Sequence, residues 1–265
     1  MGGRPRSSRP RSVARRLTTY RYDSLPSTQT VARQLAESGA EEWTAVLAGE
    51  QTAGRGRLER GFYSPPGGLY VSVILRPRVA PAQAPFAALV AGLAQAEAIE
   101  GICGVRAVLK WPNDLLLRGR KLSGLLAESA VLGDSLDYIL LGIGINANVS
   151  GFTTELATSA TSLRIELDRE FNLDALWSEL RSSLQRRFRQ WQDAGAEPIC
   201  RDWRIWPNVL GETVRVTTDT DSWDGIASDV AEDGALLLTT SSGTRRVLAA
   251  DVRLISRGPK DFGHD

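Results

Sequence analysis

The sequence predicts an α+β protein in which a mixed, largely antiparallel sheet is flanked by helices and followed by a small C-terminal SH3-like β-barrel. Three observations lead to this fold class. Short apolar runs separated by turn residues fill residues 105–145 too closely for parallel crossovers, which need about a dozen residues or more. Apolar residues with helical spacing lie on both sides of this region. From Leu210 the pattern changes to short strands between turns, which is typical of a small barrel.

Each expected element rests on a cap, a stop or an apolar period. Ser27 or Thr28 can cap the first helix, and Asn172 can cap the longest one. The expected helices are residues 28–39, 85–101, 172–195 and 198–206. The expected strands of the main sheet are residues 44–49, 69–75, 105–111, 115–117, 122–131 and 138–145. The expected strands of the barrel are residues 213–216, 223–230, 235–239 and 245–249.

The chain is expected to divide into a main domain, a small second domain and two tails. Residues 1–16 contain six Arg and no acidic residue, a composition that predicts disorder. The main domain is expected over residues 17–207 and the barrel over residues 208–257. Residues 258–265 are expected to be a loose tail.

Length and composition exclude several classes of protein. The chain has 265 residues, and its 32 Lys plus Arg against 31 Asp plus Glu give no general attraction to nucleic acid or membranes. No apolar run approaches the length of a membrane span. Cys103 and Cys200 cannot form a disulfide framework, which favours a reducing, cytoplasmic location. His264 is the only histidine, which argues against a catalytic His triad and a His-ligated metal.

The first candidate for chemistry is the loop segment Gly54-Arg55-Gly56-Arg57. Alternating glycines let backbone N–H groups approach an anion, and the arginines add fixed charge. A lone segment of this kind is also typical of a solvated surface loop. It is neither a P-loop nor a good dinucleotide fingerprint, because Glu59 stands where a third Gly would be needed.

The second candidate joins Lys110-Trp111-Pro112-Asn113-Asp114 to Lys121-Leu122-Ser123-Gly124. An ordinary turn accounts for the middle of the first segment. It does not account for the lysines, since only three of the 32 basic residues are Lys and two of them lie here. A Lys that begins a strand in an apolar sheet meets a desolvation cost unless an anion pairs with it.

The third candidate is Gly142-Ile143-Gly144-Ile145-Asn146, in which glycines inside a strand mark either a bend or the close approach of a ligand. Asn146 offers a donor and an acceptor to a flat polar ligand such as a purine. Together the three candidates suit an anionic, phosphorylated ligand. They favour chemistry by positioning and cation electrostatics, as in nucleotidyl transfer.

These motifs, taken in order, resemble the biotin protein ligase family, also called biotin–[acetyl-CoA-carboxylase] ligase. The resemblance is strong over roughly residues 20–165 and looser in the barrel. It also includes Ser27-Thr28-Gln29, Gln51 before the arginine loop, and Ser64-Pro65-Pro66-Gly67-Gly68-Leu69-Tyr70. It implies a class II synthetase-like catalytic domain. It also implies a reaction in which biotin and ATP form biotinyl-5′-AMP, from which a lysine of a biotin carboxyl carrier protein takes the biotin.

The resemblance also implies residue roles. Ser27, Thr28, Gln29 and Gln51 are expected at the polar head of biotin, and Arg55, Gly56 and Arg57 over the ligand and its phosphate. Lys121, followed by Gly124, is expected to reach the biotin carboxylate and then the adenylate phosphate. Asn146 is expected near adenine, and Asp114 beside Mg²⁺ or the incoming lysine. Lys121, Arg57 and Asp114 are the expected catalytic residues, and no metal site built by the protein alone is expected.

The sequence departs from the family pattern at Glu59, which replaces a usual Gly, and at Phe62, which replaces a usual Trp. No helix-turn-helix segment precedes the expected domain, so DNA is not expected as a partner, and neither is a membrane. The family contains monomers and dimers, which leaves a homodimer open. The alternatives are a lipoate–protein ligase of the same fold and a binding protein for biotin or a nucleotide without catalysis.

Overall fold

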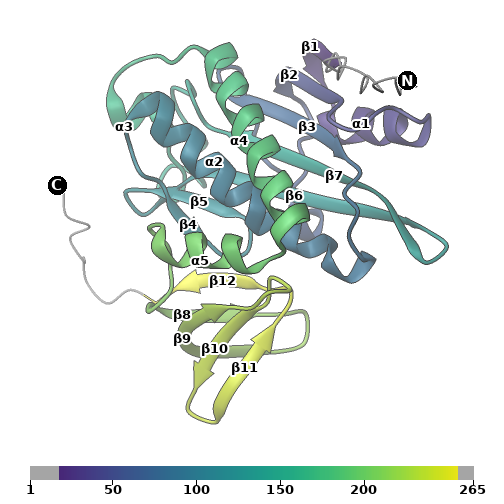
Figure 1. The fold of residues 1–265 in the computed structure, drawn as a ribbon. Helices are drawn as coiled ribbons and strands as arrows, with labels where there is room; N and C mark the ends of the chain where they lie inside the picture. Colours follow the sequence, from purple (N-terminus) through teal and green to yellow (C-terminus); the bar gives the residue numbers. More distant parts are fainter. Residues whose placement is uncertain (1–17, 256–265) are drawn as a thin grey trace, which may run out of the picture.

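The computed structural model describes residues 18–255, and its ribbon contains two sheets (Figure 1). The first sheet has seven strands in the order β1-β2-β3-β7-β6-β5-β4, and the second has five in the order β11-β10-β9-β8-β12. The expected fold class is confirmed. In the described part of the chain, β11 and β12 do not pair with each other, so backbone pairing leaves the expected barrel open. The two expected tails, residues 1–16 and 258–265, lie outside the described residues.

The bounds of the elements follow the expected pattern closely. The first sheet consists of β1 (Thr19–Leu25), β2 (Ala45–Gln51), β3 (Leu69–Leu75), β4 (Val108–Lys110), β5 (Asp114–Leu117), β6 (Arg120–Leu132) and β7 (Ser135–Ile145). The second consists of β8 (Thr213–Thr217), β9 (Ser222–Val230), β10 (Leu236–Thr240), β11 (Gly243–Val247) and β12 (Asp251–Leu254). The α-helices are α1 (Thr28–Glu37), α2 (Ala87–Cys103), α3 (Leu163–Leu167), α4 (Leu173–Ala194) and α5 (Glu197–Ile205). Two short 3₁₀ helices are η1 (Arg57–Glu59) and η2 (Pro81–Phe86).

Two strands and one α-helix have no counterpart in the sequence-based expectation. Strand β1 is largely exposed and is held to β2 by parallel backbone pairing, so its sequence carries no apolar alternation. Strand β12 buries Val252 alone among its four residues. Helix α3 has five residues, too few to show a helical period. The close spacing of β4 to β7 does produce the expected antiparallel pairing.

The two faces of the first sheet bury different helices. Helices α2 and α4 pack on one face with the larger core, while α1 packs on the other (Figure 1). Alternation along β2 shows this directly, because Ala45 and Leu47 belong to the larger cluster and Val46 to the smaller one with Ala32. The longest helix is capped as expected, since Asn172 Oδ1 accepts a hydrogen bond from the Ala175 backbone N–H at 3.0 Å.

The helical segment Pro81–Cys103 corrects one expectation from the sequence. Among the described residues it is long and apolar enough to cross a membrane, contrary to the statement that no such run exists. Its most apolar window is 72% buried inside the fold. Because the core of the protein surrounds this segment on most sides, its residues are apolar all round the helix.

The two sheets are joined at the loop that precedes β5 and at the segment that leaves α5. The Leu109 backbone N–H donates to the Pro207 carbonyl oxygen at 2.8 Å, and the Val209 N–H donates to the Leu109 carbonyl oxygen at 3.1 Å. The Trp111 indole Nε1–H donates to the Gly234 carbonyl oxygen at 2.8 Å. These contacts fix the second sheet next to the residues that the sequence singled out around Asp114.

Candidate active site

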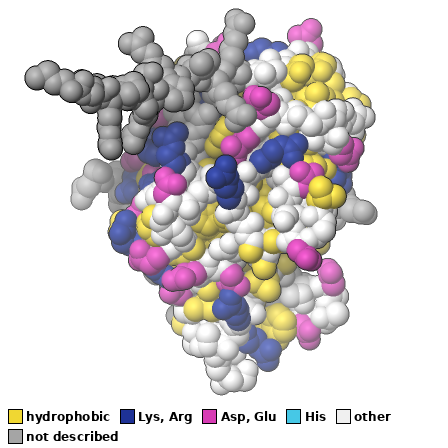
Figure 2. Space-filling model, turned by 45° about the vertical axis from the view of Figure 1, so that its right-hand side comes forward, with side chains coloured by type: hydrophobic (Ala, Val, Ile, Leu, Met, Phe, Trp, Pro, Cys, Tyr) yellow, Lys and Arg dark blue, Asp and Glu magenta, His cyan; other side chains and the backbone are white. Residues whose placement is uncertain are grey.

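A cleft opens where the first sheet meets strand β12. Its empty volume, open mouth included, is about 790 Å³, within the range of small-molecule sites. Most residues that the sequence singled out line this cleft: Ser27, Thr28, Gln29, Gln51, Arg55, Gly56, Arg57, Asp114, Lys121 and Gly124. Figure 2 shows basic and acidic side chains interspersed over one face of the molecule.

Asn146, which was expected near adenine, lies outside the cleft lining. It is 4% exposed, and its Nδ2 donates to the Thr161 carbonyl oxygen at 3.0 Å. Its buried Oδ1 has no hydrogen-bond partner within the described residues. The side chain is therefore held in the second layer behind the cleft, with one acceptor left unsatisfied.

A polar subsite closes one end of the cleft at the start of α1. The Thr28 backbone N–H and Oγ1 both donate to Gln51 Oε1, at 2.9 and 3.0 Å. Thr28 Oγ1 also lies 2.9 Å from Ser72 Oγ, which donates to Gln29 Oε1 at 2.8 Å. Buried polar side chains need such partners, and this network fixes their orientation.

Ser27 is positioned in this subsite by the helix it precedes. Its backbone takes the N-cap conformation of α1, as the sequence predicts, but its side chain makes no capping hydrogen bond. Ser27 Oγ is buried, lines the cleft and has no hydrogen-bond partner in the described part of the chain. A buried hydroxyl without a partner costs free energy unless a ligand or water pairs with it, so this group is available to a ligand.

The arginine loop also lines the cleft and is tied to the second domain. Arg57 Nη1 donates to Asn113 Oδ1 at 3.3 Å and to the Ala250 carbonyl oxygen at 3.2 Å. Burial lowers the pKa of Arg57, and the carboxylates of Asp251 and Asp114 oppose that shift. Arg60 forms an ion pair with Asp251, which also lines the cleft. A half-buried guanidinium of this kind is poorly hydrated and therefore interacts strongly with an anion.

Arg55 points toward a different carboxylate. Its Nη2 lies 3.6 Å from Glu128 Oε1, while Glu128 Oε2 accepts a hydrogen bond from Gln29 Nε2 at 2.9 Å. Glu128 also pairs with Arg33 of α1 at 2.9 Å. The arginine loop is thus connected through one carboxylate to the polar subsite.

Asp114 lies between two of the three lysines of the chain. Its Oδ1 is 2.6 Å from Lys121 Nζ, and its Oδ2 is 3.4 Å from Lys110 Nζ. The antiparallel pairing of β4 with β5 sets Lys110 opposite Asp114, and the pairing of β5 with β6 brings in Lys121. Lys121 lines the cleft and Lys110 does not, so the two lysines differ in their access to a ligand.

The floor of the cleft is made by two glycines and one aromatic ring. Gly124 and Gly144 face each other across β6 and β7, and the Phe62 ring lies over both. A Cβ atom on Gly144 would overlap this ring. Phe62 packs edge-on against Tyr70, with ring centroids 6.5 Å apart, and Lys121 Nζ lies 5.8 Å from its centroid. The floor of the cleft therefore suits an apolar ring of a ligand that lies beside the Lys121 ammonium group.

Several lining residues were not predicted from the sequence. Asp251 comes from the second sheet, and its place in the cleft depends on long-range packing that leaves no local signal. Ser72 offered a signal, because it is the polar residue in the otherwise apolar strand β3. Asn113, Arg60 and Phe62 belong to predicted motifs or loops but were not assigned to the site.

A cleft that combines convergent cations with a polar end and an apolar floor defines an enzyme that activates a small acid with a nucleotide, by positioning and charge. Residues 22–146 match the family model described as "Biotin/lipoate A/B protein ligase family". Residues 209–254 match "Biotin protein ligase C terminal domain". The chain belongs to the biotin protein ligase family, and it is an enzyme of the ligase class.

Relatives and solved structures agree with this assignment. The chain is 34% identical to the "Bifunctional ligase/repressor BirA" of Bacillus subtilis, over 88% of this chain and 73% of that protein. It is 33% identical to the "Biotin--[acetyl-CoA-carboxylase] ligase" of Paracoccus denitrificans, over 85% of this chain and 96% of that protein. The Aquifex aeolicus biotin protein ligase in complex with biotin and ATP superposes with a TM-score of 0.78 at 28% identity, covering 89% of this chain and 99% of that one.

Proposed function

We propose that this enzyme activates biotin as biotinyl-5′-AMP and transfers it to a lysine of a biotin carboxyl carrier protein. In the first step, a biotin carboxylate oxygen attacks the α-phosphorus of ATP and pyrophosphate leaves. In the second, the carrier lysine amine attacks the carbonyl of the mixed anhydride and AMP leaves. The observation that carries this proposal is that Lys121, Arg57 and the Ser27–Gln51 subsite share one cleft.

The polar subsite suits the ureido group of biotin. A cyclic urea presents two N–H donors and one carbonyl acceptor, and the subsite offers Ser27 Oγ, Thr28 Oγ1 and the Gln51 amide. The dithiolane ring of lipoate has no such groups, so it would leave the buried Ser27 Oγ without a hydrogen-bond partner. This difference favours biotin over lipoate, the second candidate substrate.

Lys121 and Arg57 supply the charge that the first step needs. A carboxylate and a polyphosphate repel each other, and fixed cations in a partly dry cleft lower that repulsion without reorganising. Lys121 Nζ already holds a carboxylate, that of Asp114, at 2.6 Å. We assign Lys121 to the biotin carboxylate and α-phosphate, Arg55 and Arg57 to the phosphates, and Gly56 and Gly124 to close backbone approach. Asn146 is assigned to the second layer near adenine.

Mg²⁺ is expected to arrive with ATP. Among the described residues no group of three or more His, Cys, Asp or Glu side chains could hold a metal ion. Two carboxylates, Asp114 and Asp251, do line the cleft, and Mg²⁺ is commonly held by one or two carboxylates together with substrate phosphates. The residues therefore fit an ion that depends on the nucleotide and that neutralises phosphate charge when bound.

Further parts of the proposal concern the whole chain. We propose a catalytic domain over residues 17–207, a second domain over residues 208–257, and a carrier domain of acetyl-CoA carboxylase or a related carboxylase as partner. A cytoplasmic location is supported by Cys103 and Cys200, which are free and buried. The oligomeric state, monomer or homodimer, is measured by sedimentation with and without biotin and ATP.

The experiment that tests the proposal is ATP–pyrophosphate exchange with biotin, with lipoate, and with neither acid. We expect exchange with biotin alone, followed by biotin transfer when a carrier domain is added. If pyrophosphate exchange requires lipoate, the substrate acid is lipoate and not biotin. Binding of biotin without any exchange would instead support a non-catalytic binding protein.

A further inference from the structure

A buried carboxylate lies behind the cleft, next to Lys121 but outside the lining. The Glu166 side chain is 2% exposed and is held by three groups. Arg120 Nη2 lies 2.6 Å from its Oε1, Arg118 Nη1 lies 3.2 Å from its Oε2, and Thr161 Oγ1 donates to Oε1 at 2.5 Å. A carboxylate with this burial needs such compensation, so the cluster acts as a unit.

Two of these partners adjoin the backbone of Lys121. Arg120 directly precedes it in β6. Thr161 lies on the other side, because the Thr161 N–H donates to the Lys121 carbonyl oxygen at 2.9 Å. The Lys121 N–H in turn donates to the Ser159 carbonyl oxygen at 2.8 Å, forming a parallel bridge centred on Ala160. The backbone position of Lys121 therefore depends on the segment that Glu166 holds.

The turn between β5 and β6 brings both arginines to the same carboxylate. Arg118 and Gly119 have φ values of 49° and 76°, which fold the chain tightly enough for Arg118 and Arg120 to reach Glu166 together. Two guanidinium groups this close repel each other unless a carboxylate lies between them. Without the charge of Glu166, the turn and the Ser159–Thr161 segment lose their common anchor.

We propose that Glu166 is a positioning residue for the first step: it fixes Lys121 through Arg120 and Thr161 without touching substrate. This inference rests on the proposed function and extends it to a residue behind the cleft. A displacement of about 1 Å at a reacting group can cost roughly 100-fold in rate, so a positioning role has a measurable consequence.

The test uses Glu166→Gln in the full chain, with biotin-dependent pyrophosphate exchange. We expect kcat to fall about 10- to 100-fold and the KM for biotin to rise by a smaller factor, because Lys121 is assigned to the biotin carboxylate but the polar subsite at Ser27 and Thr28 lies on other elements. Glu166→Asp, which keeps the charge, should recover part of kcat. Thr161→Val removes one partner and keeps both ion pairs, so it should lower kcat in the same direction and less severely.

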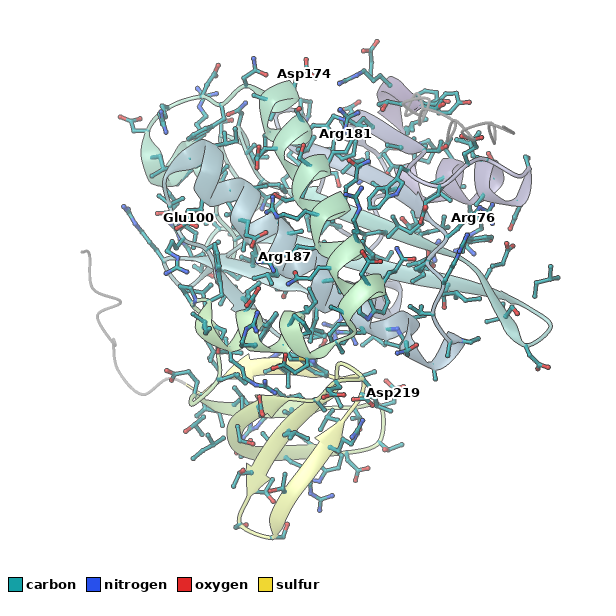
Figure 3. The ribbon with its side chains drawn as sticks, in the orientation of Figure 1. Arg76, Glu100, Asp174, Arg181, Arg187 and Asp219 are labelled. Carbon is teal, nitrogen blue, oxygen red and sulfur yellow. The ribbon has the colours of Figure 1, made fainter. Side chains whose placement is uncertain are left out.

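Coupling to Lys121 separates positioning from general stability. In a Lys121→Ala background, Glu166→Gln should cause no further fall in kcat, since the group it positions is gone. Glu97→Gln is the matched control. Glu97 is also a carboxylate held by two arginines, Arg186 and Arg187, but it lies on α2 and does not line the cleft. Arg187, which is labelled in Figure 3, lies on α4. Glu97→Gln should lower the thermal midpoint and leave kcat per folded molecule unchanged.

The inference is overturned if Glu166→Gln and Thr161→Val both keep the wild-type kcat. It is also overturned if the effects of Glu166→Gln and Lys121→Ala multiply, or if Glu97→Gln lowers kcat as much at equal loss of stability. Absence of biotin-dependent exchange in the wild-type enzyme would contradict the proposed function instead. The two failures are therefore distinguishable in one set of assays.

Discussion

The indole of Trp111 donates its Nε1–H to the carbonyl oxygen of Gly234 at 2.8 Å, and this bond joins the turn before Asp114 to the second sheet. Trp111 is 1% exposed, so the bond is shielded from water. Gly234 has a φ of 88°, a value that favours glycine at the turn presenting this carbonyl. The position of Asp114 thus depends on a residue about 120 positions further along the chain.

Trp111→Phe should therefore weaken both folding and catalysis. Phe keeps an aromatic ring, but a smaller one, and the Gly234 carbonyl is left buried without its donor, which by itself costs about 1–3 kcal/mol of unfolding free energy. Urea denaturation and pyrophosphate exchange measure the two effects. Trp206→Phe is the control, because its indole donates to the Ala107 carbonyl at 2.9 Å and does not bind the second sheet. Equal effects of the two variants on exchange would contradict the link to Asp114.

Lys121→Ala should be the most damaging single change in the cleft. Loss of one preorganised cation at the reacting carboxylate and phosphate should lower adenylate formation about 10²- to 10³-fold in a folded protein. Lys121→Arg should also lose most activity, because its forked donors point differently. Lys110→Ala removes the other lysine that pairs with Asp114. Lys110 does not line the cleft, so this change should lower adenylate formation less than Lys121→Ala does. If Lys121→Ala keeps most of its exchange activity, the central cation lies elsewhere.

Gly144→Ala should lower the free energy of unfolding and weaken biotin binding. The added methyl would overlap the Phe62 ring, and this overlap costs about 1–3 kcal/mol of the free energy of unfolding. A Phe62 ring displaced from the cleft floor should also raise the KM for biotin, roughly tenfold for each 1.4 kcal/mol of binding free energy lost. Gly101→Ala is the control, since its added Cβ would meet Glu179 at an ordinary 3.8 Å. An unchanged KM in Gly144→Ala would show that the ring can move at no cost.

The two buried thiols should make stability fall in alkaline solution. Burial raises the pKa of Cys103 and of Cys200 to about 11 from an ordinary 9.0, with nearby charges contributing less. Between these values the unfolded chain loses thiol protons that the folded chain keeps, so unfolding becomes easier as pH rises from about 9 to 11. Denaturation measured across this range should show the fall, and Cys103→Ala with Cys200→Ala should reduce it. An equal pH slope in that double variant would rule out the thiols.

The sequence predicted those parts of the fold whose signals are local. Cap residues, apolar periods and short turns located α1, α2, α4 and the meander from β4 to β7. Most of the cleft-lining residues belong to the predicted motifs, because neighbouring residues of one motif stay together in the fold. The sequence could not show that Asp251 lines the cleft, since that depends on how the two sheets pack against each other.

Other features that the sequence did not reveal have a different cause. Strand β1 is exposed at the edge of the sheet, so selection for burial leaves no pattern in it. Asn146 is buried with its amide donating to the Thr161 carbonyl oxygen, a contact between segments that sequence spacing does not reveal, and its place near adenine stays a prediction. Such tertiary contacts decide which polar residues of a motif face a ligand and which support it.

The pairing of Lys121 with Asp114 gives the resting enzyme an internal substitute for its substrate acid. Biotin would then meet Lys121 with its charge already neutralised by Asp114. The biotin carboxylate would replace the Asp114 carboxylate at Lys121 rather than add a new ion pair. Because one ion pair replaces another, the net change in exposed charge is small. We therefore expect biotin affinity to depend only weakly on ionic strength, in contrast to a binding step that is driven by bare positive charge.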